Sequence, residues 1–213
     1  VYNIATSAAA RLGWTDRVAD LVGRAGHLHV MGSALSMPGA ARVIERAAEV
    51  VKRRGGTISV DPNLRKELAH DAATGRLFSD LVGICDLLLP SGDELDHAAG
   101  AAGTDAALAR LFDRGVKEVA LKQGRAGATV FAPGCRPQHA PAFAVTELDP
   151  TGAGDCFGGA YVACRRLGMA VPVALTYATA AGARTVMRRG PMEGAATRAE
   201  LDAFIAATPR IAP

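Results

Sequence analysis

Several features that define other protein classes are missing from this sequence. Its four cysteines form no CxxC pair and no zinc-ribbon spacing, so the usual cysteine-based zinc and redox motifs are excluded. No run reaches the roughly 18 apolar residues that a membrane-spanning helix needs. No charged segment followed by an apolar stretch and a cleavage site marks a secretory signal. We therefore expect no membrane partner and a location in the reducing cytoplasm.

Concentrated positive charge is also lacking. The formal net charge is only +3, and the 24 Lys and Arg residues are scattered rather than gathered into the basic stripe of nucleic-acid-binding proteins. No GxGxxG unit follows an early strand, which argues against a nicotinamide-dependent oxidoreductase. We find no internal repeat, low-complexity segment or linker. The sequence therefore predicts no nucleic-acid partner and a single domain over residues 1–213.

What the sequence does contain is an alternation of short apolar runs with segments of helical period, typical of βα units in a parallel sheet. We expect strands at 27–31, 57–60, 86–89 and 116–121, with helices at 38–54, 71–83 and 104–114. Hairpin-like segments at 128–132 and 140–145 then precede helices at about 155–168, 171–186 and 197–207. With right-handed crossovers, the predicted fold class is α/β: a three-layer, doubly wound, mainly parallel sheet.

The stretch from Asp149 to Asp155, which reads D-P-T-G-A-G-D, carries the strongest indication of chemistry. Small residues at the start of a helix leave its first N–H groups open to an anion, which the helix dipole attracts. Gly152, Ala153 and Gly154 are therefore the candidate anion hole. Asp155 is the candidate base that accepts a proton from a substrate hydroxyl. The alternative is that Asp155 only complements the helix dipole and the glycines only form a turn.

The whole string resembles the second signature of the ribokinase-like (PfkB-type) carbohydrate kinases, D-x-T-G-A-G-D before a glycine-rich helix. Further segments resemble the same family in the same order: 61–65 its D-x-N-x-R segment, 91–94 its N-x-x-E segment, 122–127 its nucleotide loop and 179–182 its adenine-side helix. The resemblance implies an ATP-dependent kinase that transfers the γ-phosphoryl group to a sugar hydroxyl with Mg²⁺. It also implies that the family's N-terminal strands and β lid are absent, so that 1–213 is the C-terminal two-thirds of the fold.

The resemblance assigns roles to individual residues. It implies nucleotide contacts at Lys122, Gly124, Gly127, Ser91, Glu94 and Thr179, and substrate contacts at Arg65, Tyr2 and Asp155. Glu94 is also expected to organise Mg²⁺ through water, and Asp149 and Thr151 are expected in a loop that binds a monovalent cation such as K⁺. Ser91 and Thr179 depart from the family, in which Asn is common at both positions.

The sugar itself stays open. Residues 2–9 resemble the 2-keto-3-deoxygluconate kinase branch, but Ile4 stands where that branch tends to carry an arginine. The candidate substrates are therefore 2-keto-3-deoxygluconate, a ketohexose such as fructose or tagatose, and ribose. The alternative function is a non-catalytic sugar- or nucleotide-binding protein on a kinase scaffold. A homodimer is a further expectation, because the family often dimerises through its lid strands.

Overall fold

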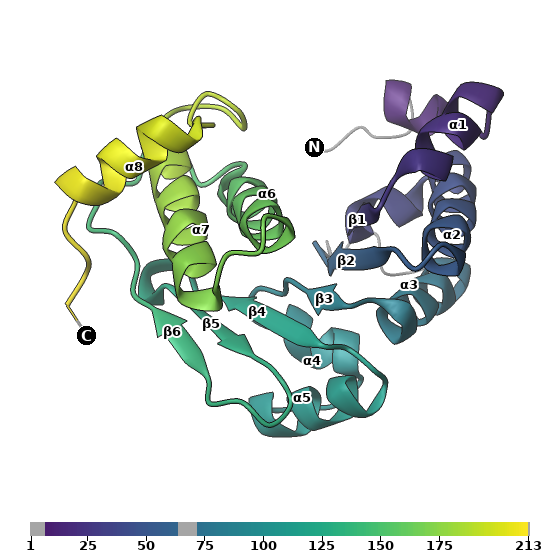
Figure 1. Ribbon diagram of the computed structural model, residues 1–213, viewed down its shortest axis with the longest axis horizontal. Helices are drawn as coiled ribbons and strands as arrows, with labels where there is room; N and C mark the ends of the chain where they lie inside the picture. Colours follow the sequence, from purple (N-terminus) through teal and green to yellow (C-terminus); the bar gives the residue numbers. More distant parts are fainter. Residues whose placement is uncertain (1–6, 64–71, 213) are drawn as a thin grey trace. The chain divides into compact units, whose positions relative to one another are not determined.

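The computed structural model describes residues 7–63 and 72–212. Its chain divides into two compact units, with the boundary between Val119 and Ala120. Six strands form one sheet in the order β1-β2-β3-β4-β5-β6 (Figure 1). They are β1 His27–Met31, β2 Thr57–Asp61, β3 Leu87–Leu88, β4 Glu118–Lys122, β5 Ala128–Phe131 and β6 Gln138–Ala140. The pairs from β1 to β4 are parallel and β5 pairs with β6 antiparallel, which confirms the predicted α/β class with a mainly parallel sheet.

The first unit is built from βα units. Its helical elements are η1 Ala8–Arg11, α1 Asp16–Arg24, η2 Gly32–Ser36, α2 Pro38–Arg53, α3 Ala72–Ile84, α4 Glu94–Ala99 and α5 Thr104–Asp113. Helix α2 begins with Pro38, whose fixed φ suits the first helical position. It buries one apolar stripe, which includes Val43 and Val51, and it packs against β1 and β2. Removing such a stripe from water supplies much of the stability of this layer.

The other face of β1 and β2 is polar. The His27 ring nitrogens lie 2.7 Å from Thr57 Oγ1 and 2.9 Å from Ser59 Oγ, and His29 Nδ1 lies 2.7 Å from the same Ser59 oxygen. These pairs follow the parallel register of the two strands, in which His27 stands opposite Thr57 and His29 opposite Ser59. The two histidines therefore join β1 to β2 through their side chains.

The second unit packs three helices beside the end of the sheet. They are α6 Ala153–Arg166, α7 Val171–Val186 and α8 Arg198–Ala207, and a short turn of 3₁₀ helix, η4, spans Gly124–Ala126. Helices α6 and α7 lie side by side, and α8 packs against α7 (Figure 1). Phe157 and Tyr161 are buried and stack at 6.2 Å between ring centroids. The N-terminus of α8 closes with a capping box between Thr197 and Glu200.

Some expected boundaries are wrong. Strand β6 covers Gln138–Ala140 rather than 140–145, because Pro141 has no N–H with which to extend the ladder. The residues after it pair instead with the C-terminal segment, through hydrogen bonds from Ala144 N to Pro209 O and from Ile211 N to Ala142 O, both 2.8 Å. Helices α1 and α4 were not expected, and α6 begins at Ala153, two residues early.

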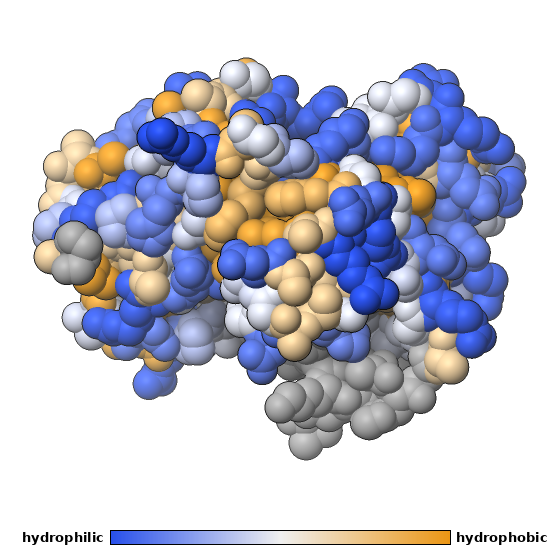
Figure 2. All heavy atoms as spheres, turned by 90° about the horizontal axis from the view of Figure 1, so that it is seen from below, coloured by the Kyte–Doolittle hydropathy of each residue, from blue (hydrophilic) through white to orange (hydrophobic). Residues whose placement is uncertain are grey.

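The surface matches this arrangement of amphipathic elements. Hydrophilic residues cover much of the face shown in Figure 2, with hydrophobic residues exposed between them. Within residues 7–63 and 72–212, no helix combines the length and the apolar character needed to span a membrane.

Candidate active site

The N-terminus of α6 is built around Gly152. This residue precedes the helix with φ +82°, and a Cβ placed on it would lie 2.2 Å from Pro191 O. Both the left-handed backbone and the close approach require glycine. The N–H of Ala153 donates to Pro150 O at 3.2 Å, so one of the three expected anion-hole amides is directed toward its own turn. Ala153 and Gly154 are the first two residues of the helix, so the predicted anion hole consists of the residue before α6 and the start of its first turn.

Two charged side chains stand at this helix end. Asp155 lies in the first turn of α6 and is exposed. A Cβ on Gly154 would lie 3.6 Å from Lys122 Nζ, so the ammonium group of the last residue of β4 reaches the first turn of α6. The structure thus brings Lys122 together with the predicted anion hole. Helix dipole and ammonium charge both favour an anion at this position.

The loop after β4 makes the tight turn that its glycines predict. Gly124 has φ +56° and Gly127 has φ +95°, and the N–H of Gln123 donates to Gly127 O at 2.9 Å. A Cβ on Gly127 would lie 2.1 Å from Ala140 O and 2.9 Å from the carbonyl carbon of Pro141. The expected nucleotide loop therefore rests against the end of β6, in contact backbone to backbone.

Asp149 fastens the loop before α6 to the segment after α7. One carboxylate oxygen accepts from Thr151 N at 3.0 Å, and the other accepts from Gly190 N at 2.9 Å. Hydrogen bonds from Thr151 and Gly190 hold the pKa of the Asp149 carboxyl at about 2, below its ordinary value of 3.8. The N–H groups of Leu148 and Asp149 also donate to Val186 O, at 2.7 and 3.2 Å. The structure thus brings Asp149 and Thr151 together with the 185–190 segment.

Thr179 lies buried on α7, and its hydroxyl both donates and accepts a hydrogen bond. The hydroxyl donates to Leu175 O at 2.8 Å, and its oxygen accepts from Arg210 Nη1 at 2.9 Å. Sequence reasoning missed Arg210 altogether. Its position 31 residues beyond Thr179 gives no periodic signal, and only the return of the C-terminal segment beside residues 142–144 brings it there.

The remaining predicted residues belong to the first unit or lie outside the described residues. Ser91 N donates to Glu94 Oε2 at 2.7 Å, which holds this carboxylate over the turn that starts α4. Asp61 is buried at the end of β2 and accepts from Asn63 N at 3.2 Å. Arg65 and Tyr2 fall outside the described residues. The two units are described separately, so Ser91 and Glu94 are not placed relative to Lys122 or Asp155.

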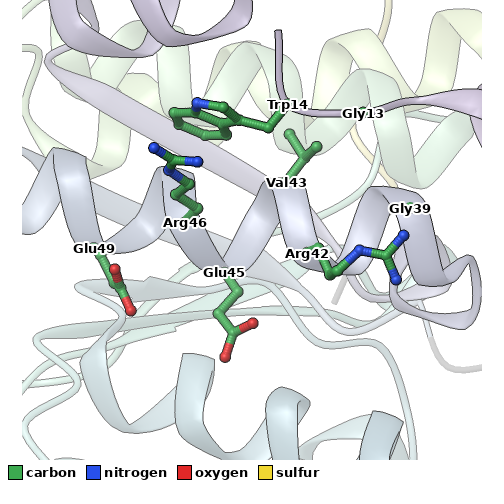
Figure 3. A pocket seen from close by; sticks show the side chains of 8 residues that line it. All are labelled: Gly13, Trp14, Gly39, Arg42, Val43, Glu45, Arg46 and Glu49. Atoms are coloured by element: carbon green, nitrogen blue, oxygen red, sulfur yellow. The ribbon is translucent and has the colours of Figure 1, made fainter.

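A pocket of about 480 Å³ in the first unit contains none of the predicted site residues. The Arg46 guanidinium carbon lies 4.3 Å from the centroid of the Trp14 ring, a cation–π contact. Figure 3 shows that Arg46 points toward Trp14, whereas Glu45 and Glu49 point away from it. This contact attaches the segment before α1 to α2.

A second pocket, of about 360 Å³, opens between α6, α7 and α8. Its wall is formed mainly by small and apolar side chains and includes the thiols of Cys156 and Cys164. Across the described parts of the chain, no three His, Cys, Asp or Glu side chains gather to hold a metal ion.

Comparisons with known proteins identify the family of the chain. The model of the pfkB family of carbohydrate kinases matches residues 1–198. The chain therefore belongs to the pfkB carbohydrate kinase family. It is 30% identical over 210 residues to 2-dehydro-3-deoxygluconokinase of Bacillus subtilis, an alignment that covers 94% of this chain and 63% of that protein. The chain thus spans less than two-thirds of the length of this relative.

Solved structures show the same fold. An E. coli protein provisionally assigned as ribokinase II, in complex with ATP and Mg²⁺, superposes with a TM-score of 0.90 at 36% identity, covering 97% of this chain and 67% of that one. A fructokinase double mutant from Vibrio cholerae O395, bound to fructose, ADP and a potassium ion, gives a TM-score of 0.75 at 29% identity. That match covers 84% of this chain and 60% of the fructokinase. The ribokinase-like fold is therefore established for the chain.

Proposed function

We propose that this protein is an ATP-dependent sugar kinase and that the second unit carries its phosphoryl-transfer machinery. The observation that carries the proposal is the meeting of Lys122 Nζ with Gly154 at the N-terminus of α6, one residue before Asp155. An ammonium group and a helix N-terminus together attract a phosphate. A carboxylate in the same turn can accept a proton.

The proposed reaction follows from these groups. The sugar hydroxyl oxygen bonds to the γ-phosphorus of ATP, the bond from that phosphorus to the β,γ-bridging oxygen breaks, and ADP leaves. The hydroxyl proton passes to an oxygen of Asp155. The first turn of α6 and Lys122 would stabilise the negative charge on the transferred group. Because phosphoryl transfer is largely dissociative, Asp155 needs to orient the hydroxyl more than to activate it.

The chain's own residues also fit the expected cations. Mg²⁺ would neutralise the phosphates, since magnesium is commonly held by one or two carboxylates plus substrate phosphates. Glu94 is the carboxylate that the family resemblance assigns to Mg²⁺ through water. Asp149, kept ionised by Thr151 and Gly190, would shape a K⁺ loop with Thr151 and the 185–190 backbone. The potassium ion in the related fructokinase structure supports this assignment.

For the substrate, we propose a 2-keto-3-deoxy sugar acid, with ketohexoses and ribose as the competing candidates. The similarity to 2-dehydro-3-deoxygluconokinase extends over 94% of this chain, which supports the sugar acid. The fructose-bound structural relative supports the ketohexose. The cytoplasmic location and the homodimer remain predictions.

Replacing Asp155 tests the catalytic assignment. We expect Asp155→Asn to keep the fold and ATP affinity but to lower kcat by about 10²–10⁴-fold, because the orienting base is lost. Coupled ADP release with the purified protein and a saturating sugar measures this. Asp113→Asn, at the exposed end of α5, is the matched control and should turn over normally. Near-normal kcat in Asp155→Asn would contradict the assignment.

A sugar panel tests the substrate class. Rates of ADP release with 2-keto-3-deoxygluconate, fructose, tagatose and ribose should favour the sugar acid by at least about tenfold in kcat/KM, the effect of one well-placed charged hydrogen bond. Equal rates on acid and neutral sugars would contradict this choice. ATP binding with no turnover on any of the sugars would instead indicate a non-catalytic binding protein.

A further inference from the structure

Arg210, on the segment after α8, joins three parts of the second unit. Its guanidinium carbon lies 3.8 Å from the centroid of the Phe143 ring. One nitrogen, Nη1, donates both to Thr179 Oγ1, at 2.9 Å, and to Pro141 O. Burial lowers the pKa of this guanidinium from its ordinary value, and the group stays charged. The side chain is thus fixed by stacking on one face and by two hydrogen bonds at one edge.

Thr179 is one of the expected nucleotide-site residues, and Pro141 contacts the expected nucleotide loop. Pro141 follows β6 and lies beside the Gly127 turn. A Cβ placed on Gly127 would lie 2.9 Å from the carbonyl carbon of Pro141. Thr179 lies on α7, and the same helix contains Gly182. A Cβ placed on Gly182 would lie 3.4 Å from Ala153 O at the predicted anion hole. Arg210 therefore links the nucleotide loop to the helix that borders the phosphate site.

The hydrogen bonds of Thr179 indicate its role beside Arg210. A hydroxyl has one proton to donate, and the acceptors within reach of the Thr179 hydroxyl are Leu175 O at 2.8 Å and Thr176 O at 3.1 Å, both in its own helix. Its oxygen receives Arg210. The side chain of Thr179 therefore supports Arg210, and its contact with the nucleotide stays a prediction.

The C-terminal segment carries Arg210 into this position. After α8 (yellow in Figure 1), Pro209 O accepts from Ala144 N and Ile211 N donates to Ala142 O, each at 2.8 Å. The Phe143–Arg210 bridge lies between these two bonds. The backbone of the segment is thus paired on both sides of Arg210, which limits the positions its side chain can take.

We propose that Arg210 is a positioning residue for ATP: it fixes the end of β6, on which the expected nucleotide loop rests, relative to helix α7. The proposal rests on the proposed kinase function for its choice of ligand. Without Arg210, Pro141 and Thr179 would lose their common partner. ATP binding would then have to order the end of β6 and helix α7. The loss of conformational entropy on binding would be larger than in the native protein, where folding has already ordered both elements.

The test combines kinetics with direct binding. We expect Arg210→Ala to raise KM for ATP about tenfold, the effect of losing a charged hydrogen bond, while kcat and KM for the sugar change less than about twofold. Arg210→Lys keeps the charge without the planar fork and should recover part of the affinity. Arg136→Ala, an exposed arginine in the loop before β6, is the matched control and should match the unmodified protein.

A double-mutant cycle separates positioning from general destabilisation. Thr179→Val removes the hydroxyl that accepts from Arg210, so the combined Arg210→Ala and Thr179→Val variant should raise KM for ATP no more than the single Arg210 change does. Additive effects, or lower melting temperatures with an unchanged KM for ATP, would overturn the proposal.

Fluorescence titration with mant-ATP keeps this inference distinct from the proposed function. If the unmodified protein binds mant-ATP but turns over no sugar, the kinase proposal fails, and weaker binding by Arg210→Ala would still support the positioning role. If turnover is normal and Arg210→Ala binds mant-ATP as tightly as the unmodified protein, only the positioning role fails. No mant-ATP binding by the unmodified protein would overturn both.

Discussion

At Gly152, backbone conformation and available space both exclude a side chain. Its φ of +82° is left-handed, and Pro191 O stands 2.2 Å from where a Cβ would be. We expect Gly152→Ala to lower the free energy of unfolding by about 2–4 kcal/mol, the sum of a left-handed backbone penalty and a backbone clash. Urea unfolding measures the change.

Gly159 provides the matched control on the same helix. It lies in the interior of α6, and a Cβ there would meet nothing within 4 Å. Gly159→Ala should therefore raise the free energy of unfolding by about 0.5–1 kcal/mol, because alanine loses less backbone entropy in a helix. If both variants moved stability in the same direction, the close packing of Gly152 against Pro191 would be wrong.

Asp149 should make stability depend on acid. Its pKa of about 2 in the folded protein lies below the ordinary 3.8, so its ionised form favours folding. That contribution is complete above about pH 4 and is lost as the pH falls toward 2. Asp149→Asn should melt below the unmodified protein at pH 6, and the gap should close by pH 2. Melting curves recorded from pH 2 to 7 measure this, and a constant gap would contradict it.

Among the elements, the sequence is most informative where a pattern is local. The period of α2 and its Pro38 start are both visible in the sequence, and the helix appears where they indicate. Strand β6 was misplaced because residues 142–144 pair with 209–211, a partner almost 70 residues away that no local period reveals. Helix α4 was missed because six residues are too few to show a helical period.

In the candidate site, too, the sequence predicts features that depend on adjacent residues better than contacts between distant segments. The D-P-T-G-A-G-D string places Gly152 and Asp155 correctly at a helix start, since the required backbone and charge are written in adjacent residues. The approach of Lys122 to Gly154 and of Arg210 to Thr179 joins segments about 30 residues apart. Sheet topology could suggest the first, because strand ends gather at one edge. Nothing in the sequence suggests the second.

Asp86 connects three elements of the first unit. Its carboxylate accepts from Ile58 N at 2.9 Å and pairs with Lys52 at 3.1 Å and Lys117 at 2.8 Å. Burial raises the pKa of Asp86, but the hydrogen bonds from Lys117, Ile58 and Lys52 outweigh it, and the net shift is downward. The carboxylate therefore ties the end of α2 and the starts of β2 and β4 together in its ionised form.

Asp86→Asn should weaken this junction. We expect the free energy of unfolding to fall by about 1–3 kcal/mol, because two ammonium groups lose a shared charged acceptor. Urea unfolding measures it, and Asp80→Asn, an exposed change on α3, should leave stability within about 0.5 kcal/mol. Equal stability of the two variants would mean that the Asp86 contacts are screened by solvent.

At the scale of the whole molecule, the question is whether the two units unfold together. The boundary between Val119 and Ala120 falls inside β4, whose first residues pair with β3 in the first unit. A strand cannot keep its pairing when half of it unfolds, so the shared strand favours one cooperative transition. That residues 1–213 form a single domain stays a prediction.

Two buried thiols can report this transition. Cys85 belongs to the first unit and Cys164 to the second, with exposed fractions of 2% and 8%. Burial raises the pKa of both thiols, that of Cys85 to about 12, so neither reacts readily in the folded protein. Thiol labelling at increasing urea, read by mass spectrometry, should give one common midpoint for the two residues. The exposed Cys135 should label without urea and serves as the internal standard. Separate midpoints for Cys85 and Cys164 would show that the units unfold independently, and the shared β4 would then not couple them.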